Sequence, residues 1–146
     1  MLTGKDYCDY ETCVALKELG YKVPTSAYYM PNNNQLIFVS NPCRGGYVID
    51  CFRSHNSFPK DVMTASYIDA PTMWEVQKWL REEKNIIVDV RYGALYYNVV
   101  LNHTITGGRH IVKDKNNRIA DFTEYEEALS EGIKETIKHI EKYETL

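Results

Sequence analysis

The segment NPCRGGYVID, residues 41–50, places a cysteine, an arginine and two glycines ahead of an expected strand. Glycines can let backbone N–H groups cradle a phosphate. A phosphate-binding loop, however, leads into a helix and is followed by Lys-Ser/Thr, whereas here a strand follows. A tight turn is therefore the favoured interpretation. An enzyme site near residues 44–55 is kept as a third hypothesis, and it requires Arg44, Asp50 or His55 to converge in a pocket.

Histidine spacing offers a second possible chemistry. His55 and Ser57 in SHNS form half of a two-histidine phosphoesterase signature, in which one histidine acts as base and the other as acid. The residues that follow His103, His110 and His139 do not complete the pair. The sequence also has no Gly-x-Ser-x-Gly elbow, no His-Glu-x-x-His motif and no EF-hand loop. We therefore expect a protein that is not an enzyme, with catalytic residues unknown and no cofactor or metal.

The cysteines are Cys8, Cys13, Cys43 and Cys51, and the two pairs are separated by four and seven residues. Zinc sites usually bring their ligands in close pairs. Adding His55 after Cys51 gives a Cys-x3-His spacing, which is suggestive only by itself. The favoured interpretation is reduced, mostly structural thiols, and whether Cys43, Cys51 and His55 meet in space is left open.

A basic run, GGRHIVKDKNNR, carries Arg109, Lys113, Lys115 and Arg118 against one acid, Asp114. The order of elements in the second half is that of double-stranded RNA binding domains, which need a lysine cluster at the start of their final helix. That start here is TEYEE, whose negative charge would repel a phosphate backbone. Nucleic-acid binding through the hairpin at residues 109–118 is therefore the second hypothesis, and a solvated charged turn is the simpler alternative.

Length and composition limit the number of domains and the classes of function that these residues can serve. A chain of 146 residues fits a single domain over residues 1–146, with a loose subdivision near residues 65–69 as an option. The net charge of −3 argues against a strongly basic nucleic-acid binder overall. Twelve tyrosines are many for this length, and they suit either a sheet-rich core or a contact surface. The polar N-terminus and the short apolar runs predict a cytoplasmic protein without a membrane span.

Hydrophobic periodicity predicts the elements that position these side chains. Helices are expected over 9–19, 71–83 and 123–143, and a strand–turn–strand over 23–39. Further β segments are expected at 45–52, 86–91, 95–101, 109–114 and 118–122, with a turn at Gly93 and a loop over 53–66. This order predicts an α+β domain in which antiparallel sheet packs with about three helices in two layers.

The two tryptophans lie five residues apart on the expected second helix, about 140° apart around its axis. Trp79 borders the apolar stripe, whereas Trp74 lies off it. Trp74 either fills a second buried contact or is an exposed hot spot for a partner. With Tyr96 and Tyr97 it forms the set of possible partner-contact residues.

The stretch APTMWEVQKWLREEKNI, the strand pair after it and YEEALSEGIKETIKHI together resemble a group of hypothetical proteins borne by phages and mobile elements of gut bacteria. YETCVALKELGY at residues 10–21 and the paired Tyr28 and Tyr29 are also similar to that group, whereas residues 41–63 depart from it. The second half is similar to the phage α-β-α sandwich domain family. Neither resemblance implies an activity or a site residue.

These observations predict a non-enzymatic phage or mobile-element accessory protein that acts by protein binding in the cytoplasm of a host bacterial cell. Its expected partner is a host protein, a phage protein or a second copy of itself.

Overall fold

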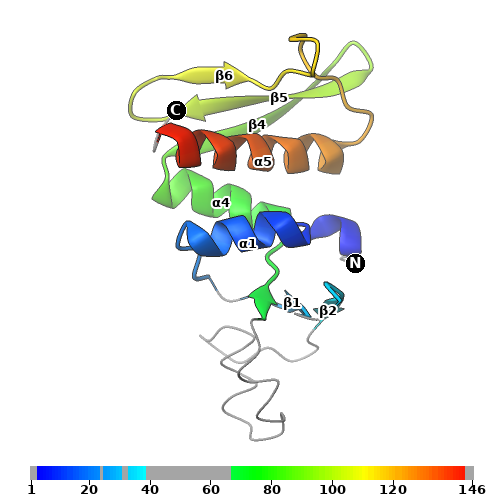
Figure 1. Ribbon diagram of the computed structural model, residues 1–146. Coiled ribbons are helices and arrows are strands. Elements are labelled where there is room, and N and C mark those ends of the chain that lie inside the picture. The colour runs from blue at the N-terminus through cyan, green and yellow to red at the C-terminus, as the bar shows by residue number, and fades with distance from the viewer. Residues whose placement is uncertain (1–2, 24, 31–32, 39–66, 144–146) are drawn as a thin grey trace, which may run out of the picture. The chain divides into compact units, whose positions relative to one another are not determined.

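The computed structural model of this protein describes residues 3–23, 25–30, 33–38 and 67–143 (Figure 1). The strand expected at 45–52 and the loop expected at 53–66 lie outside these residues. The described part contains three α-helices and two three-stranded antiparallel sheets, which confirms the predicted α+β class. Its contacts fall into two compact units, Met1–Thr72 and Met73–Leu146. The single domain expected over 1–146 stays a prediction.

The first unit combines one helix with the smaller sheet. A 3-10 turn, Gly4–Asp6, precedes α1, Tyr10–Glu18, and the strands are β1, Ala27–Tyr29, β2, Leu36–Phe38, and β3, Ile68–Asp69. The strand order is β2-β1-β3, with β1 antiparallel to both neighbours. β3 was not predicted, because two residues are too few to show an alternating pattern.

Side-chain capping explains where α1 begins. The Asp9 carboxylate accepts a hydrogen bond from the Thr12 backbone N–H at 2.9 Å, as expected for an N-cap. Gly20 follows the helix with a φ of +92°, a conformation that a residue without a Cβ adopts without strain. The helix expected at 9–19 is thus confirmed to within a residue at each end.

Tyrosines contribute much of the core of the first unit. Tyr7, Tyr21, Tyr28, Tyr29 and Tyr67 are all buried. The Tyr29 hydroxyl donates to the Cys8 carbonyl at 2.6 Å, so this buried phenol is paired. Part of the tyrosine excess in the sequence therefore serves a core.

The second unit places two helices with the longer sheet. Its elements are α4, Met73–Glu83, β4, Ile86–Gly93, β5, Tyr96–His103, β6, Arg109–Ile111, and α5, Tyr125–Tyr143. The strands pair antiparallel in the order β4-β5-β6, and α5 lies along one face of this sheet (Figure 1). The strand expected at 118–122 is wrong. Ile119 and Phe122 make only isolated bridges, to Lys113 and Tyr97.

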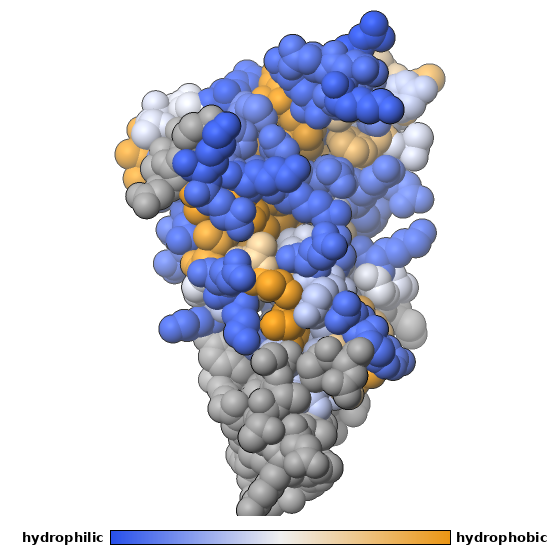
Figure 2. Space-filling model, in the orientation of Figure 1, coloured by the Kyte–Doolittle hydropathy of each residue, from blue (hydrophilic) through white to orange (hydrophobic). Residues whose placement is uncertain are grey.

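Alternation in β4 and helical spacing in α5 build the core of this unit. Ile86 and Val88 of β4 are buried and lie opposite His103 and Leu101 of β5. The predicted α5 stripe is also buried at Leu129, Ile133, Ile137 and Ile140. The polar side of α5 faces outward, and the region over this helix in Figure 2 is mainly hydrophilic.

The helix and the sheet approach most closely at Gly132 of α5. A Cβ atom at this position would lie 2.7 Å from Val88 Cγ1 and 2.7 Å from Val99 Cγ2. One turn on, the fully buried Thr136 hydroxyl donates to the Gly132 carbonyl at 2.7 Å, which satisfies it inside the helix. Glycine therefore serves close packing here and not a special backbone angle.

The β4–β5 turn differs from the expected one. Gly93 is the last residue of β4 and pairs with Tyr96, so the turn itself consists of Ala94 and Leu95. Both have positive φ, +52° and +72°. A two-residue hairpin turn with positive φ at both positions favours Asn-Gly, because most other residues are strained there.

None of the helices in the described part of the chain has both the length and the apolar content that a membrane crossing requires.

Replacing Gly132 with alanine tests the close approach. The added methyl group would clash with two β-branched side chains, and overpacking of this kind costs about 1–3 kcal/mol. Alanine recovers about 1 kcal/mol of helix propensity. Because two contacts at 2.7 Å place the clash in the upper part of this range, about 2–3 kcal/mol, we expect the free energy of unfolding in urea to fall by roughly 1–2 kcal/mol.

Gly93→Ala is the matched control, since a Cβ at Gly93 meets nothing within 4 Å. Its unfolding free energy should change by less than about 0.5 kcal/mol. A Gly132→Ala protein as stable as the wild type would contradict the packing described here.

Candidate functional site

The tryptophans differ in exposure as their helical phase predicts. Trp79 is 8% exposed, whereas Trp74, in the first turn of α4, is 38% exposed. The buried stripe of α4 is Met73, Val76 and Leu80. Trp74 therefore presents part of its ring to solvent, as the partner-contact hypothesis requires. Whether a partner uses it stays a prediction.

The two predicted tyrosines point to opposite faces of the β4–β5 hairpin. Tyr96 is 45% exposed. Tyr97 is half-buried, and its ring centroid lies 4.9 Å from that of Tyr92 and 5.9 Å from that of Tyr125 on α5. Tyr97 therefore helps to fix the hairpin onto the start of α5, and Tyr96 is the more available of the two.

The turn end of this hairpin carries the most exposed large apolar side chain of the described residues. Leu95 is 82% exposed, and its neighbours Tyr92 and Tyr96 are 64% and 45% exposed. We call Tyr92, Leu95 and Tyr96 the hairpin-end surface. Sequence reasoning missed Tyr92 and Leu95 because it placed the turn at Gly93. The signal was the apolar pair Ala94-Leu95 at a position where turns favour Asn or Gly.

The basic hairpin does expose its cations. Arg109, Lys113, Lys115 and Arg118 are all exposed. Asp114 has a structural role, since its Oδ1 accepts from the backbone N–H groups of Asn116, at 2.8 Å, and Arg118, at 3.1 Å.

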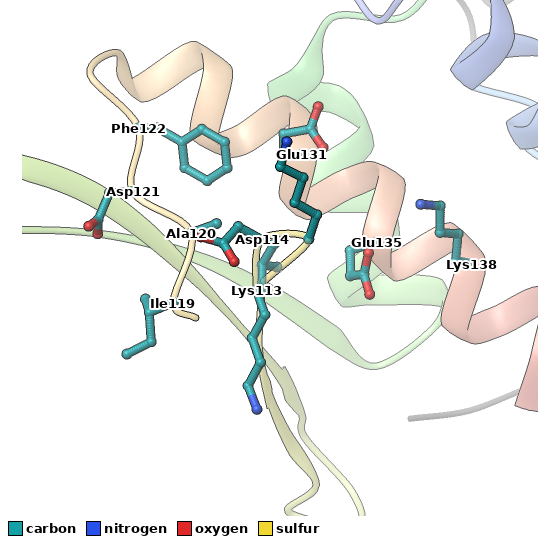
Figure 3. A pocket seen from close by; sticks show the side chains of 11 residues that line it. Lys113, Asp114, Ile119, Ala120, Asp121, Phe122, Glu131, Glu135 and Lys138 are labelled. Atoms are coloured by element: carbon teal, nitrogen blue, oxygen red, sulfur yellow. The ribbon is translucent and has the colours of Figure 1, made fainter. Parts of the chain in front are cut away.

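A cavity of about 500 Å³ lies between this hairpin and α5 (Figure 3). Lys113 and Lys115 line one side, and Glu131, Glu135 and Lys138 of α5 line the other. The two glutamates bring negative charge beside the lysines, which does not favour a phosphate backbone. Nucleic-acid binding through residues 109–118 stays a prediction.

A histidine–glutamate cluster lies between β6 and α5. His110 Nε2 is 3.4 Å from Glu135 Oε1, and His139 Nε2 is 3.7 Å from the same oxygen. The ring centroids of the two histidines are 4.3 Å apart. All three residues are half-buried, and one ligand atom from each lies within 4.8 Å of the others. This is the set among the described residues that could hold a metal ion.

Burial and the neighbouring His110 lower the pKa of His139, while Glu135 opposes them. The neutral form of the His139 imidazole is thereby favoured. His103 does not belong to this cluster. It is buried, and its Nδ1 accepts a hydrogen bond from the Thr106 backbone N–H at 3.0 Å. Sequence reasoning missed the cluster because His110 is far along the chain from the other two. The local signal was the Glu135-x3-His139 spacing, which places both side chains on one helix face.

Of the cysteines, Cys8 and Cys13 are buried thiols that form no disulfide, as the structural interpretation expects. Burial raises the pKa of the Cys13 thiol far above its ordinary value, and nearby Cys8 adds to the effect. Cys43, Cys51, His55, Arg44 and Asp50 lie outside the described residues. The hypothesis of a small enzyme with a site near 44–55 therefore stays a prediction.

No protein family model, curated protein or solved structure gives a significant match to this chain. The phage and mobile-element resemblance stays a prediction.

The burial of Cys13 predicts its chemistry. A thiol that is both inaccessible and held protonated is a poor nucleophile. In native protein treated with iodoacetamide near neutral pH, we expect the peptide that contains Cys13 to stay unmodified. In urea the same peptide should be alkylated fully. Mass spectrometry of the digested protein measures both, and rapid alkylation of native Cys13 would show that its site opens.

Proposed function

We propose that this protein is a non-enzymatic accessory protein of a phage or mobile element, and that it binds another protein through the hairpin-end surface. The observation that carries the proposal is Leu95, which is 82% exposed and has a φ of +72°. An exposed leucine in the left-handed region is unfavourable both in its solvation and in its backbone.

The cost of this turn supports a role beyond folding. A non-glycine residue in the left-handed region costs roughly 1–2 kcal/mol. Asn-Gly at Ala94-Leu95 would close the same turn without that strain. Strained backbone often lies where function requires a particular side chain. The leucine in turn presents an aliphatic group at the end of a rigid two-stranded ribbon.

The composition of the hairpin-end surface suits a protein partner. Tyrosine provides a large rigid contact area together with a hydroxyl that can pair at the rim. Tyr92 is paired with Tyr97, so Tyr92 and Tyr96 lie on opposite faces of the hairpin end, with Leu95 at the turn between them in sequence. The complementary surface is an apolar cleft on a host or phage protein that receives the hairpin end and contacts both of its faces. Trp74, 38% exposed on α4, is a further candidate contact.

Leu95→Gly separates binding from stability. Glycine removes the exposed side chain and at the same time relieves the strain at φ +72°. We expect the unfolding free energy to stay the same or to rise by up to about 1 kcal/mol. Affinity for the partner should fall by about tenfold or more, as for the loss of an interface anchor. The measurement is an affinity pull-down from host lysate, followed by titration of each retained protein against wild-type and variant protein.

The matched control is Ile105→Ser. Ile105 is also highly exposed, at 74%, but lies after β5, at the other end of the strand from Leu95. The Ile105→Ser protein should bind the partner with the affinity of the wild type. If the partner is a second copy of the chain, light scattering should show a concentration-dependent mass that is lost in Leu95→Gly. Equal retention of every bound protein by wild-type and Leu95→Gly protein would refute the proposal.

A further inference from the structure

The side chains of His110, Glu135 and His139 converge, and His110 makes no hydrogen bond to Glu135. Both histidine Nε2 atoms converge on the same carboxylate oxygen, at 3.4 Å and 3.7 Å. Nitrogen–oxygen hydrogen bonds are usually shorter, about 2.7–3.2 Å. His110 Nε2 is buried as an atom and has no hydrogen-bond partner among the described residues. A group that lies between the three side chains would account for this arrangement.

The same distances match those between the ligands of one metal ion. Nitrogen and oxygen ligands lie about 2.0–2.1 Å from a tetrahedral zinc ion, so two such ligands are about 3.3–3.4 Å apart. The separations of 3.4 Å and 3.7 Å to Glu135 Oε1 are close to this value. All three ligand atoms already lie within 4.8 Å of one another, so a small rotation of the imidazole rings completes the set.

We propose that His110, Glu135 and His139 form a binding site for one divalent transition-metal ion, with Zn²⁺ the preferred species. Two imidazoles and one carboxylate are ligands typical of zinc, and three protein ligands leave a fourth position for water or another group. The site joins β6 to α5, and it is separate from the hairpin-end surface.

The surroundings of Glu135 allow an ion to enter. Glu135 lines the cavity between the basic hairpin and α5, so one of the three ligands borders a space open to solvent (Figure 3). The three side chains are half-buried, which reduces competition from water without enclosing the site. An ion bound here would link strand to helix and would stabilise the folded unit by mass action.

Zinc titration of the full-length protein tests the site. Protein stripped with EDTA is titrated with ZnCl₂ by calorimetry, and Co²⁺ is added in parallel because its visible spectrum reports tetrahedral coordination. We expect His110→Ala and His139→Ala each to bind one zinc ion fewer per chain than the wild type. Glu135→Gln should lower the affinity of the same site for zinc by about tenfold or more. Zinc should raise the melting temperature of the wild type but not that of the histidine variants.

Glu131→Gln is the matched control, because it makes the same chemical change on α5, one turn away in the lining of the same cavity. It should bind zinc as the wild type does. Circular dichroism of each metal-free variant confirms that the helices are retained, and Glu135→Gln serves as the conservative variant if an alanine variant does not fold. Two results would overturn the proposal: no zinc bound by the wild type, or no zinc ion lost when His110 or His139 is replaced.

Discussion

The close approach of α5 to the β4–β5 sheet is the contact on which the second unit depends. Gly132 leaves no room for even one methyl group between the helix and the side chains of Val88 and Val99. This short distance between α5 and the sheet determines which strand residues the other side chains of α5 contact. His139 lies seven residues on, nearly two full turns, so it projects toward the same side of the helix as Gly132. There it lies beside His110 of β6, at a ring separation of 4.3 Å.

The two ends of the β4–β5 hairpin serve different purposes. At the end away from the turn, where Ile86 pairs with His103, the residues Ile86, Val88 and Leu101 are buried. Their burial contributes much of the stability of the hairpin. At the turn end, Leu95 is strained and exposed. A local loss of stability is tolerable there, because the well-packed end holds the register of the strands. The proposed protein contact therefore lies at the end of a ribbon whose two strands are paired up to the turn.

The tyrosines illustrate how one composition serves two uses. In the first unit they are mostly core residues, and the Tyr29 hydroxyl is paired with the Cys8 carbonyl. In the second unit Tyr92 and Tyr96 are exposed, while Tyr97 packs edge-on against Tyr125 of α5. An amphipathic side chain suits both settings, so the count of tyrosines alone does not distinguish a core from a contact surface.

The sequence by itself determined the elements with strong local signals. The period of α5, the alternation of β4, the Asp9 cap and the different phases of Trp74 and Trp79 all depend on neighbours within a few residues, and the structure confirms them. Only the tertiary structure decided which distant side chains meet. His110 and His139 come together through strand register and helix–sheet packing, and the local Glu135-x3-His139 spacing does not show that His110 joins them. The turn at Ala94-Leu95 was also decided by pairing, because the ladder between β4 and β5 overrides the preference of glycine for turns.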